Sequence, residues 1–246
     1  MNTREQPVIA HYSYNELGRA NHGWLDARHH FSFASYHNPN RMNFGVLRVI
    51  NDDIIKAGGG FDSHPHRDME IITYVREGAI THRDNLGNEG ITKAGDVQVM
   101  SAGTGVFHSE YNLESEDTRL YQIWIEPNQK GVQPRWDAHS FPKEQRQDGK
   151  LTLLVSGDGT APLFIHQDAY IYGGTLKAGE ELLHRLHHRQ AYLLVSKGAV
   201  LLDGKYLTAG DGAELHHSDV LQLSVQHDAE LLLIDLPNPT NAGTFS

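Results

Sequence analysis

The sequence predicts an all-β protein built from two β-barrels in tandem. Short segments rich in β-branched, aromatic and leucine residues recur along the chain, separated by Gly, Asp and Asn turns. No long segment shows the 3.6-residue apolar period of a helix. A chain of 246 residues has room for two domains of about 110 to 130 residues each. These observations favour the double-sheet jelly roll, in which antiparallel sheets pack face to face.

The expected strands form two groups with a connector between them. In the first half they are 45–50, 71–75, 97–100 and 120–125. In the second half they are 151–155, 171–176, 191–196, 200–202, 220–225 and 230–234. One short helix is expected to start near Ser140, a candidate N-cap, with Pro142 in its first turn and Gly149 past its end. We therefore divide the chain into an N-terminal domain, 1–135, and a C-terminal domain, 136–246.

Composition and charge exclude several functional classes. The net charge is −10 and no run of Lys or Arg occurs, which argues against direct nucleic-acid binding. The absence of cysteine excludes disulfides, thiolate metal sites and cysteine catalysis. The first residues lack the apolar core of a signal peptide, and no apolar run approaches 18 residues. We expect a soluble cytoplasmic protein without a membrane partner.

Two residue pairs carry the functional information. His64 and His66 are two residues apart, as are His108 and Glu110, and both segments have strand character. Side chains alternate along a strand, so each pair points to one side, and two such strands side by side would make a metal site. Three imidazoles and one carboxylate suit iron, manganese, cobalt, nickel, copper or zinc. With 17 histidines, about one His-x-His pair is expected by chance, so the surrounding residues must decide.

The surrounding residues resemble the two motifs of the cupin superfamily. The first motif is matched by Gly58, His64, His66, Glu70 and Gly78. The second is matched by Gly95, Gly103, His108 and Asn112. Ser101 replaces the usual proline of the second motif, and Thr104 and Gly105 lengthen its turn. Those departures, together with the segments 20–25, 30–33, 47–53, 59–70 and 100–110, resemble the pirin family, and its bacterial quercetinase-like branch in particular.

The resemblance implies a bicupin with one divalent metal, Fe(II) first among the candidates, in the N-terminal barrel. Its ligands would be His64, His66, His108 and Glu110, and Glu110 would also be the catalytic proton acceptor. The implied reaction is cleavage of flavonols such as quercetin by dioxygen, with release of carbon monoxide. The alternative is a metal-dependent or redox-dependent regulator that binds a protein partner. Glu70 is expected behind the ligands, holding a ligand histidine or paired with an arginine.

The sequence gives less specific evidence for the pocket walls and for a site in the second half of the chain. An aromatic substrate would favour apolar walls, and the aromatic and methionine residues near the motifs are the candidates, although most of them are expected in the core. They are Phe31, Phe33, Phe44, Met100, Phe107, Tyr121 and Trp124, with Phe44, Met100 and Phe107 chosen first. The second half is a degenerate copy: with His184 placed on His64, Leu186 falls on His66 and Gln190 on Glu70. A separate metal site is left open there, against exposed histidines, at His187, His188, His216 and His217.

Overall fold

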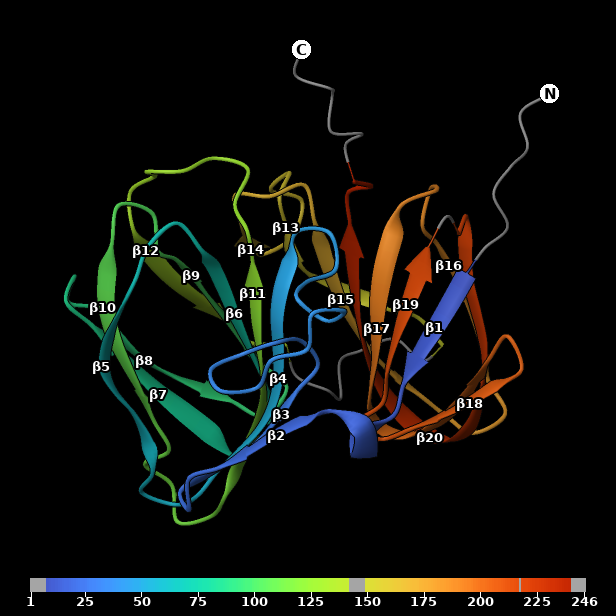
Figure 1. Cartoon of the computed structure of the whole chain (residues 1–246), viewed down its shortest axis with the longest axis horizontal. Coiled ribbons are helices and arrows are strands. Elements are labelled where there is room, and N and C mark those ends of the chain that lie inside the picture. Colours follow the sequence, from blue (N-terminus) through green and yellow to red (C-terminus); the bar gives the residue numbers. More distant parts are fainter. Residues whose placement is uncertain (1–7, 142–148, 217, 240–246) are drawn as a thin grey trace.

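The all-β prediction is confirmed. The computed structural model describes residues 8–141, 149–216 and 218–239, and within these ranges it forms strands and one 3-10 turn, Tyr14–Glu16. No helix in these ranges is long and apolar enough to cross a membrane. The expected helix after Ser140 falls on residues 142–148, which lie outside the described residues. Figure 1 shows two barrels side by side.

Two antiparallel sheets form the first barrel. The larger one has the order β12 (Arg135–His139), β9 (Val97–Ser101), β6 (Glu70–Glu77), β11 (Thr118–Ile125), β4 (Leu47–Ile55), β3 (Leu25–His29) and β2 (Gly18–Asn21). The smaller one has the order β5 (Gly60–His66), β10 (Val106–Tyr111), β7 (Ala79–Asp84) and β8 (Glu89–Lys93). Both candidate ligand pairs therefore lie in the smaller sheet, where β10 runs directly beside β5.

One nine-stranded sheet forms the second barrel. Its path is β1 (Val8–Tyr12), β19 (Gly212–His216), β17 (Gln190–Leu202), β20 (Val220–Leu236), β15 (Tyr170–Leu176), β13 (Thr152–Ser156) and β14 (Leu163–Phe164). β16 (Glu181–Arg185) pairs with β20, and β18 (Lys205–Thr208) pairs with β17. The blue strand β1 lies among the orange and red strands in Figure 1, so the N-terminus contributes to the second barrel.

The predicted boundary between the domains, residues 135/136, remains a prediction, and strand pairing does not follow it. β12 begins at Arg135 and pairs along its whole length with β9, so the first barrel continues to His139. The pairing of β1 with β19 places residues 8–12 in the second barrel.

The second half also has longer strands than the sequence pattern indicates. The segments 191–196 and 200–202 are one strand, β17, and 220–225 and 230–234 are one strand, β20. The pairing of β17 with β20 shifts register between Val195 and Val200, which bends both strands without breaking the sheet. Gly198 adopts φ +77° there, and an added Cβ would lie 2.1 Å from the Asp228 carbonyl oxygen. A glycine that reads as a chain reversal therefore marks a bend in a continuous strand.

The largest apolar cluster joins the two barrels. It includes Phe44 and Tyr121 from the first barrel and Tyr192 and Ile234 from the second, each less than 6% exposed. Arg41 lies at this junction, over the rings of Tyr12 and Phe31, and donates hydrogen bonds to Glu214 and the Tyr192 hydroxyl. The faces of the two long sheets that point away from this junction line the interiors of the two barrels. The interior of the first barrel holds the candidate site.

Candidate metal centre

Strand register brings the three predicted histidine ligands together. His108 of β10 lies opposite His64 of β5, and His66 is two residues further along the same strand. The ring centroids lie 4.8 Å apart for His64 and His66, 4.5 Å for His64 and His108, and 5.0 Å for His66 and His108. One nitrogen of each ring lies within 4.8 Å of the corresponding nitrogens of the other two. The expectation that the two motifs lie on paired strands is confirmed.

A tight turn fixes where β10 begins. Gly103 adopts φ +45°, and a Cβ at this position would lie 2.0 Å from the Val132 carbonyl oxygen. The Gly103 carbonyl also accepts a hydrogen bond from the Asp68 N–H, which ties the turn to the end of β5. Only glycine fits this backbone and this space, so the glycine of the second motif sets the start of the ligand strand.

The rings of His66 and His108 are neutral, and a hydrogen bond orients the ring of His64. Burial and the nearby His64 lower the pKa of His66 to about 4, and burial with the neighbouring histidines lowers the pKa of His108 to about 2. His64 Nδ1 lies 2.7 Å from the Asp62 carbonyl oxygen, which can only accept, so this nitrogen carries the proton and Nε2 is left with a lone pair. His108 Nε2 is buried and has no hydrogen-bond partner. Neutral imidazoles with free lone pairs are what a divalent metal requires.

Glu110 occupies a polar recess beside the histidines. Gln98, Thr73 and Gln122 stand in one register row across β9, β6 and β11. Gln98 and Thr73 donate to Glu110 Oε1 at 2.6 and 3.2 Å, and Gln122 donates to Oε2 at 2.5 Å. Burial raises the pKa of Glu110 above its ordinary value, although His82 and the donors from Gln122 and Thr73 act against it. Glu110 groups with His82 and His108 rather than with all three predicted ligands, so its place in the ligand set remains a prediction.

A cavity of about 460 Å³ opens onto these residues. Its apolar wall is aromatic: Trp124 packs edge-on against Phe33 and His66, and Trp24 packs edge-on against Phe61. Its polar lining is His22, His29, Asn51, Asp53, His64, His66, His108, Glu110 and Gln122. A space of this size with aromatic walls and a few convergent polar groups is typical of a small-molecule site. Phe33 and Trp124, two of the seven apolar candidates, thus line the cavity.

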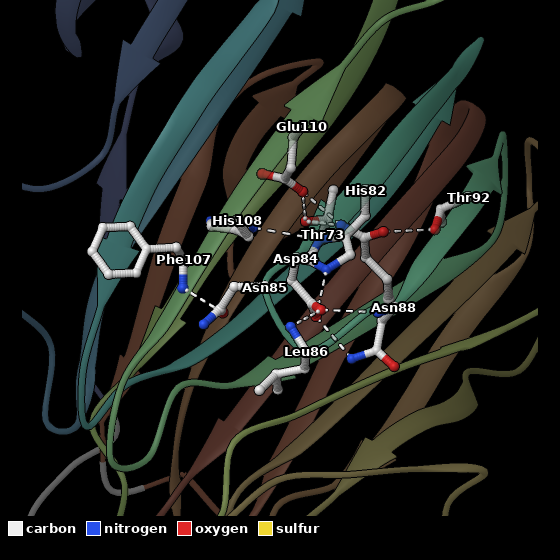
Figure 2. A network of polar contacts seen from close by, with 11 residues as sticks. Thr73, His82, Asp84, Asn85, Leu86, Asn88, Thr92, Phe107, His108 and Glu110 are labelled. Carbon is white, nitrogen blue, oxygen red and sulfur yellow. Dashed lines mark hydrogen bonds and ion pairs between the residues drawn. The ribbon is translucent and has the colours of Figure 1, made fainter.

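The three apolar residues chosen first lie elsewhere. Phe44 is in the cluster between the barrels, where its ring meets Tyr192 and His216. Met100 packs with Ile71, Ala102 and Val106 outside the cavity. Phe107 is 53% exposed, and Figure 2 shows its ring directed away from Glu110. The reason is the alternation of side chains along a strand: His108 and Glu110 face inward, so Phe107, one residue before His108, faces outward.

Glu70 does not hold a ligand histidine. Its carboxylate accepts hydrogen bonds from Ser101 at 2.8 Å and from His166 of the second half at 3.1 Å. Glu70 is also absent from the cavity lining, and neither Arg67 nor Arg48 pairs with it. Burial raises the pKa of Glu70, opposed by the hydrogen bonds from Ser101 and His166. The residue is therefore part of the contact between the two barrels.

Two residues near the site, Asp53 and His82, were not predicted from the sequence. Asp53 of β4 lines the cavity, and its buried Oδ1 has no hydrogen-bond partner. Burial raises the pKa of Asp53 well above the ordinary range. His82 of β7 is fully buried beside His108 and Glu110. Both belong to two-residue alternations, Asn51 with Asp53 and His82 with Asp84, on strands. The same spacing that identified the ligand pairs was the available signal.

Both clusters of candidate metal ligands in the described part of the chain lie in the first barrel. In the second, His184 packs against Tyr172, and His188 pairs with Asp219 at 2.5 Å. His216 lies beside Glu214 and Phe44 at the junction of the barrels. His217 falls outside the described residues.

Both halves of this chain match known proteins. Residues 11–125 match the family described as pirin, and residues 153–236 match the quercetinase C-terminal cupin domain. A pirin-like protein of Caulobacter vibrioides is 55% identical over 93% of this chain and 99% of its own length. A quercetin 2,3-dioxygenase of Escherichia coli is 45% identical over 91% of this chain and 96% of its own. The crystal structure of the E. coli bacterial pirin YhhW with nickel(II) has a TM-score of 0.87 at 44% identity and covers 94% of this chain and 99% of that one. The two matched domains, the relatives and the shared two-barrel fold show that this chain belongs to the pirin family.

Proposed function

We propose that this protein is a metal-dependent dioxygenase that cleaves flavonols of the quercetin type and releases carbon monoxide. The observation that carries the proposal is the convergence of three histidine nitrogens on an aromatic-walled cavity. Support comes from the E. coli relative named quercetin 2,3-dioxygenase. His64, His66 and His108 would hold the metal, with Glu110 as the fourth ligand. Fe(II) is our first choice, and the nickel(II) in the related crystal structure makes nickel the first competitor.

The unpartnered Nε2 of buried His108 fits this assignment, because a buried nitrogen lone pair without a partner loses the hydrogen bond it would make in water. A bound divalent metal would act as a Lewis acid and template for an enolate-like oxygen. The chain's own residues supply the rest of the site. Trp124 and Phe33 form an aromatic wall against which a planar ring system can stack.

Glu110 is the group we assign to the substrate proton. Its Oε1 is held by Gln98 and Thr73, whereas Oε2 has only the Gln122 amide, so a lone pair of Oε2 remains available. Burial raises its pKa, which makes the carboxylate a stronger base than an exposed glutamate. The same lone pair of Oε2 would serve in turn as metal ligand and, when substrate binds, as acceptor of the substrate's 3-hydroxyl proton, leaving a flavonolate. Dioxygen then adds across the central ring, two ring carbon–carbon bonds break, and the carbon between them leaves as carbon monoxide while both dioxygen atoms stay in the depside.

The test is carbon monoxide release from quercetin under dioxygen by protein loaded anaerobically with iron, and in parallel with nickel. We compare the wild type with His108→Ala, and with His227→Ala, which removes an exposed histidine of the second barrel. Stoichiometric carbon monoxide over many turnovers in the wild type and His227→Ala, and none in His108→Ala, is expected. A rate within the ordinary enzyme range of roughly 1 to 10³ per second would support a catalyst. No carbon monoxide from protein that holds its metal would contradict the proposal and favour the regulatory alternative.

A further inference from the structure

His82 lies at the centre of the first barrel, next to the metal-binding histidines. It comes from β7, where it stands opposite Glu110 of β10. Its side chain has no solvent exposure, and its ring stacks on Trp136 at 4.9 Å with an interplanar angle of 8°. The His108 ring lies on its other flank at 5.3 Å. The ring is thus held in one place by packing, and Figure 2 shows it between His108 and Asp84.

Asp84 is two residues further along β7 and its carboxylate is equally inaccessible. Oδ1 accepts hydrogen bonds from the backbone N–H groups of Leu86 and Asn88 at 2.9 and 3.0 Å. Oδ2 lies 2.8 Å from the Asn88 side-chain amide and 3.2 Å from His82 Nε2. Burial acts to raise the pKa of Asp84, but the hydrogen bonds from Asn88, His82 and Leu86 outweigh it and lower the pKa. At neutral pH this group is a carboxylate, which can only accept hydrogen bonds.

The Asp84 carboxylate determines the proton positions on His82 and His108. Because Asp84 only accepts, His82 Nε2 carries a proton. With the imidazole proton placed on Nε2, His82 offers Nδ1 as the acceptor. His82 Nδ1 lies 3.4 Å from His108 Nδ1, which must then be the donor. The remaining nitrogen, His108 Nε2, is left with a lone pair, and it is the buried nitrogen that has no partner.

We propose that Asp84 and His82 are positioning residues that hold His108 in the tautomer able to bind the metal through Nε2. The inference rests on the metal centre of the proposed function, but not on the substrate or the reaction. It assigns a purpose to two polar side chains that are inaccessible to solvent and do not line the cavity. Residues that orient a metal-binding histidine through its second nitrogen raise metal affinity by about 10-fold to 100-fold.

A direct ligand role for His82 is the competing explanation, because His82, His108 and Glu110 also form a compact group. Both nitrogens of His82 are already engaged, one by Asp84 and one by His108. The metal would have to displace one of these contacts. The two roles differ in a measurable way: loss of a ligand changes the coordination of the bound metal, whereas loss of a positioning residue weakens binding and leaves the coordination as it was.

The test uses cobalt(II) as the probe, with the full chain and a competing chelator to determine Kd. The variants are His82→Phe, which keeps a ring against Trp136, Asp84→Asn, and the double variant. Asp84→Asn keeps the shape of the side chain, but the two backbone donors at Oδ1 force its amide group toward His82, which reverses the proton order and places a proton on His108 Nε2. The control is Arg83→Gln, an exposed neighbour on the same strand whose partner is Glu89 on the surface.

We expect Kd for cobalt(II) to rise about 10-fold to 100-fold in each single variant and to stay unchanged in Arg83→Gln. The double variant should match His82→Phe alone, because Asp84 acts through His82. At saturating cobalt(II), the visible spectrum of His82→Phe should equal that of the wild type. The wild-type cobalt protein should also show a paramagnetically shifted proton from His108 Nδ1 in H2O that is absent in D2O, and His82→Phe should lose it.

Three results would overturn the inference while the wild type binds cobalt(II): an unchanged Kd in either single variant, additive losses in the double variant, or an altered saturated spectrum in His82→Phe. Additive losses would mean that Asp84 acts on the fold of the turn rather than through His82. Failure of the wild type to bind cobalt(II) would instead remove the metal centre and, with it, the proposed function. Thermal unfolding of the metal-free variants shows whether each one is folded before Kd is measured.

Discussion

His30 provides a pH-dependent test of the junction between the barrels. The ring is fully buried, its Nδ1 lies 2.9 Å from the Tyr192 hydroxyl, and its Nε2 has no partner. Burial, with the positive charge of Arg41 next, lowers the pKa of His30 to about 3. In the unfolded chain the pKa returns to about 6.5. As pH falls below about 6.5, His30 takes up a proton in the unfolded chain but not in the folded protein. The contribution of neutral His30 to the free energy of unfolding is therefore fully present above this pH and is lost as pH falls toward the pKa of His30 in the folded protein.

The magnitude follows from the gap between the two pKa values. Each pH unit between them costs about 1.4 kcal/mol, so lowering the pH from 7.5 to 5.0 removes about 2 kcal/mol through His30 alone. His30→Phe keeps the ring packed against Tyr192 but cannot take up a proton. The variant is expected to be less stable than the wild type at pH 7.5, and this difference should shrink by about 2 kcal/mol at pH 5.0.

The assay is urea unfolding of wild type, His30→Phe and the exposed-histidine control His227→Ala at the two pH values, with the metal removed from all three. Other titrating groups are common to the three proteins and cancel in the differences. The difference between His227→Ala and wild type should not change with pH. A difference between His30→Phe and wild type that is equally independent of pH would refute the reasoning, because it would mean that His30 accepts its proton in the folded state.

Three further outcomes are expected. Arg41→Ala should lower the free energy of unfolding by about 3 to 5 kcal/mol in urea titrations, because it removes the arginine of a buried ion pair and leaves the Glu214 carboxylate with only Tyr12 and His216. Arg41→Met combined with Glu214→Gln should recover part of the loss. Asp53→Asn should raise the free energy of unfolding at pH 7, because burial raises the pKa of Asp53 in the folded protein. Between the pKa of Asp53 in the unfolded chain and its pKa in the folded protein, each pH unit lowers the stability of the wild type by about 1.4 kcal/mol. Equal stability of the variant and the wild type at pH 7 would contradict this. Trp124→Ala should raise KM for quercetin about tenfold in carbon monoxide assays with a smaller change in kcat, and an unchanged KM would exclude this wall as a substrate contact.

The sequence was sufficient to predict the histidine cluster because a local rule places it. Residues two apart on a strand share a face, and paired strands bring two such faces together, so His64, His66 and His108 follow from spacing and family resemblance. The same rule, applied to Phe107, predicts an outward ring, and the preference for aromatic pocket walls wrongly overrode it. The wall residue Trp24 comes from a segment distant in sequence from both ligand pairs, and no local pattern states which barrel face it covers.

Contacts between the barrels were beyond the reach of sequence reasoning for a different reason. The partners of Glu70 and Phe44 lie in the second half, about 100 and 150 residues away in sequence, and single-sequence patterns carry no information about such pairs. The neighbouring strands β7 and β8 were also missed, because β7 includes His, Arg and Asp and β8 includes Glu, Gly and Lys, which weaken the β-branched and aromatic signal of a strand. In β7, the side chains of His82 and Asp84 are inaccessible to solvent, and His82 lies beside the metal-binding His108.

The pairing of β1 with β19 has a consequence for synthesis on the ribosome. The two strands are separated by about 200 residues of chain, which take about 10 to 40 seconds to translate at ordinary rates. During that interval the first strand to emerge has no partner, while the first barrel already has all of its own strands. The second barrel can close only when the earliest and latest parts of the chain meet. A C-terminal half expressed alone would therefore present the open edge of β19 to other chains, and such edges promote aggregation.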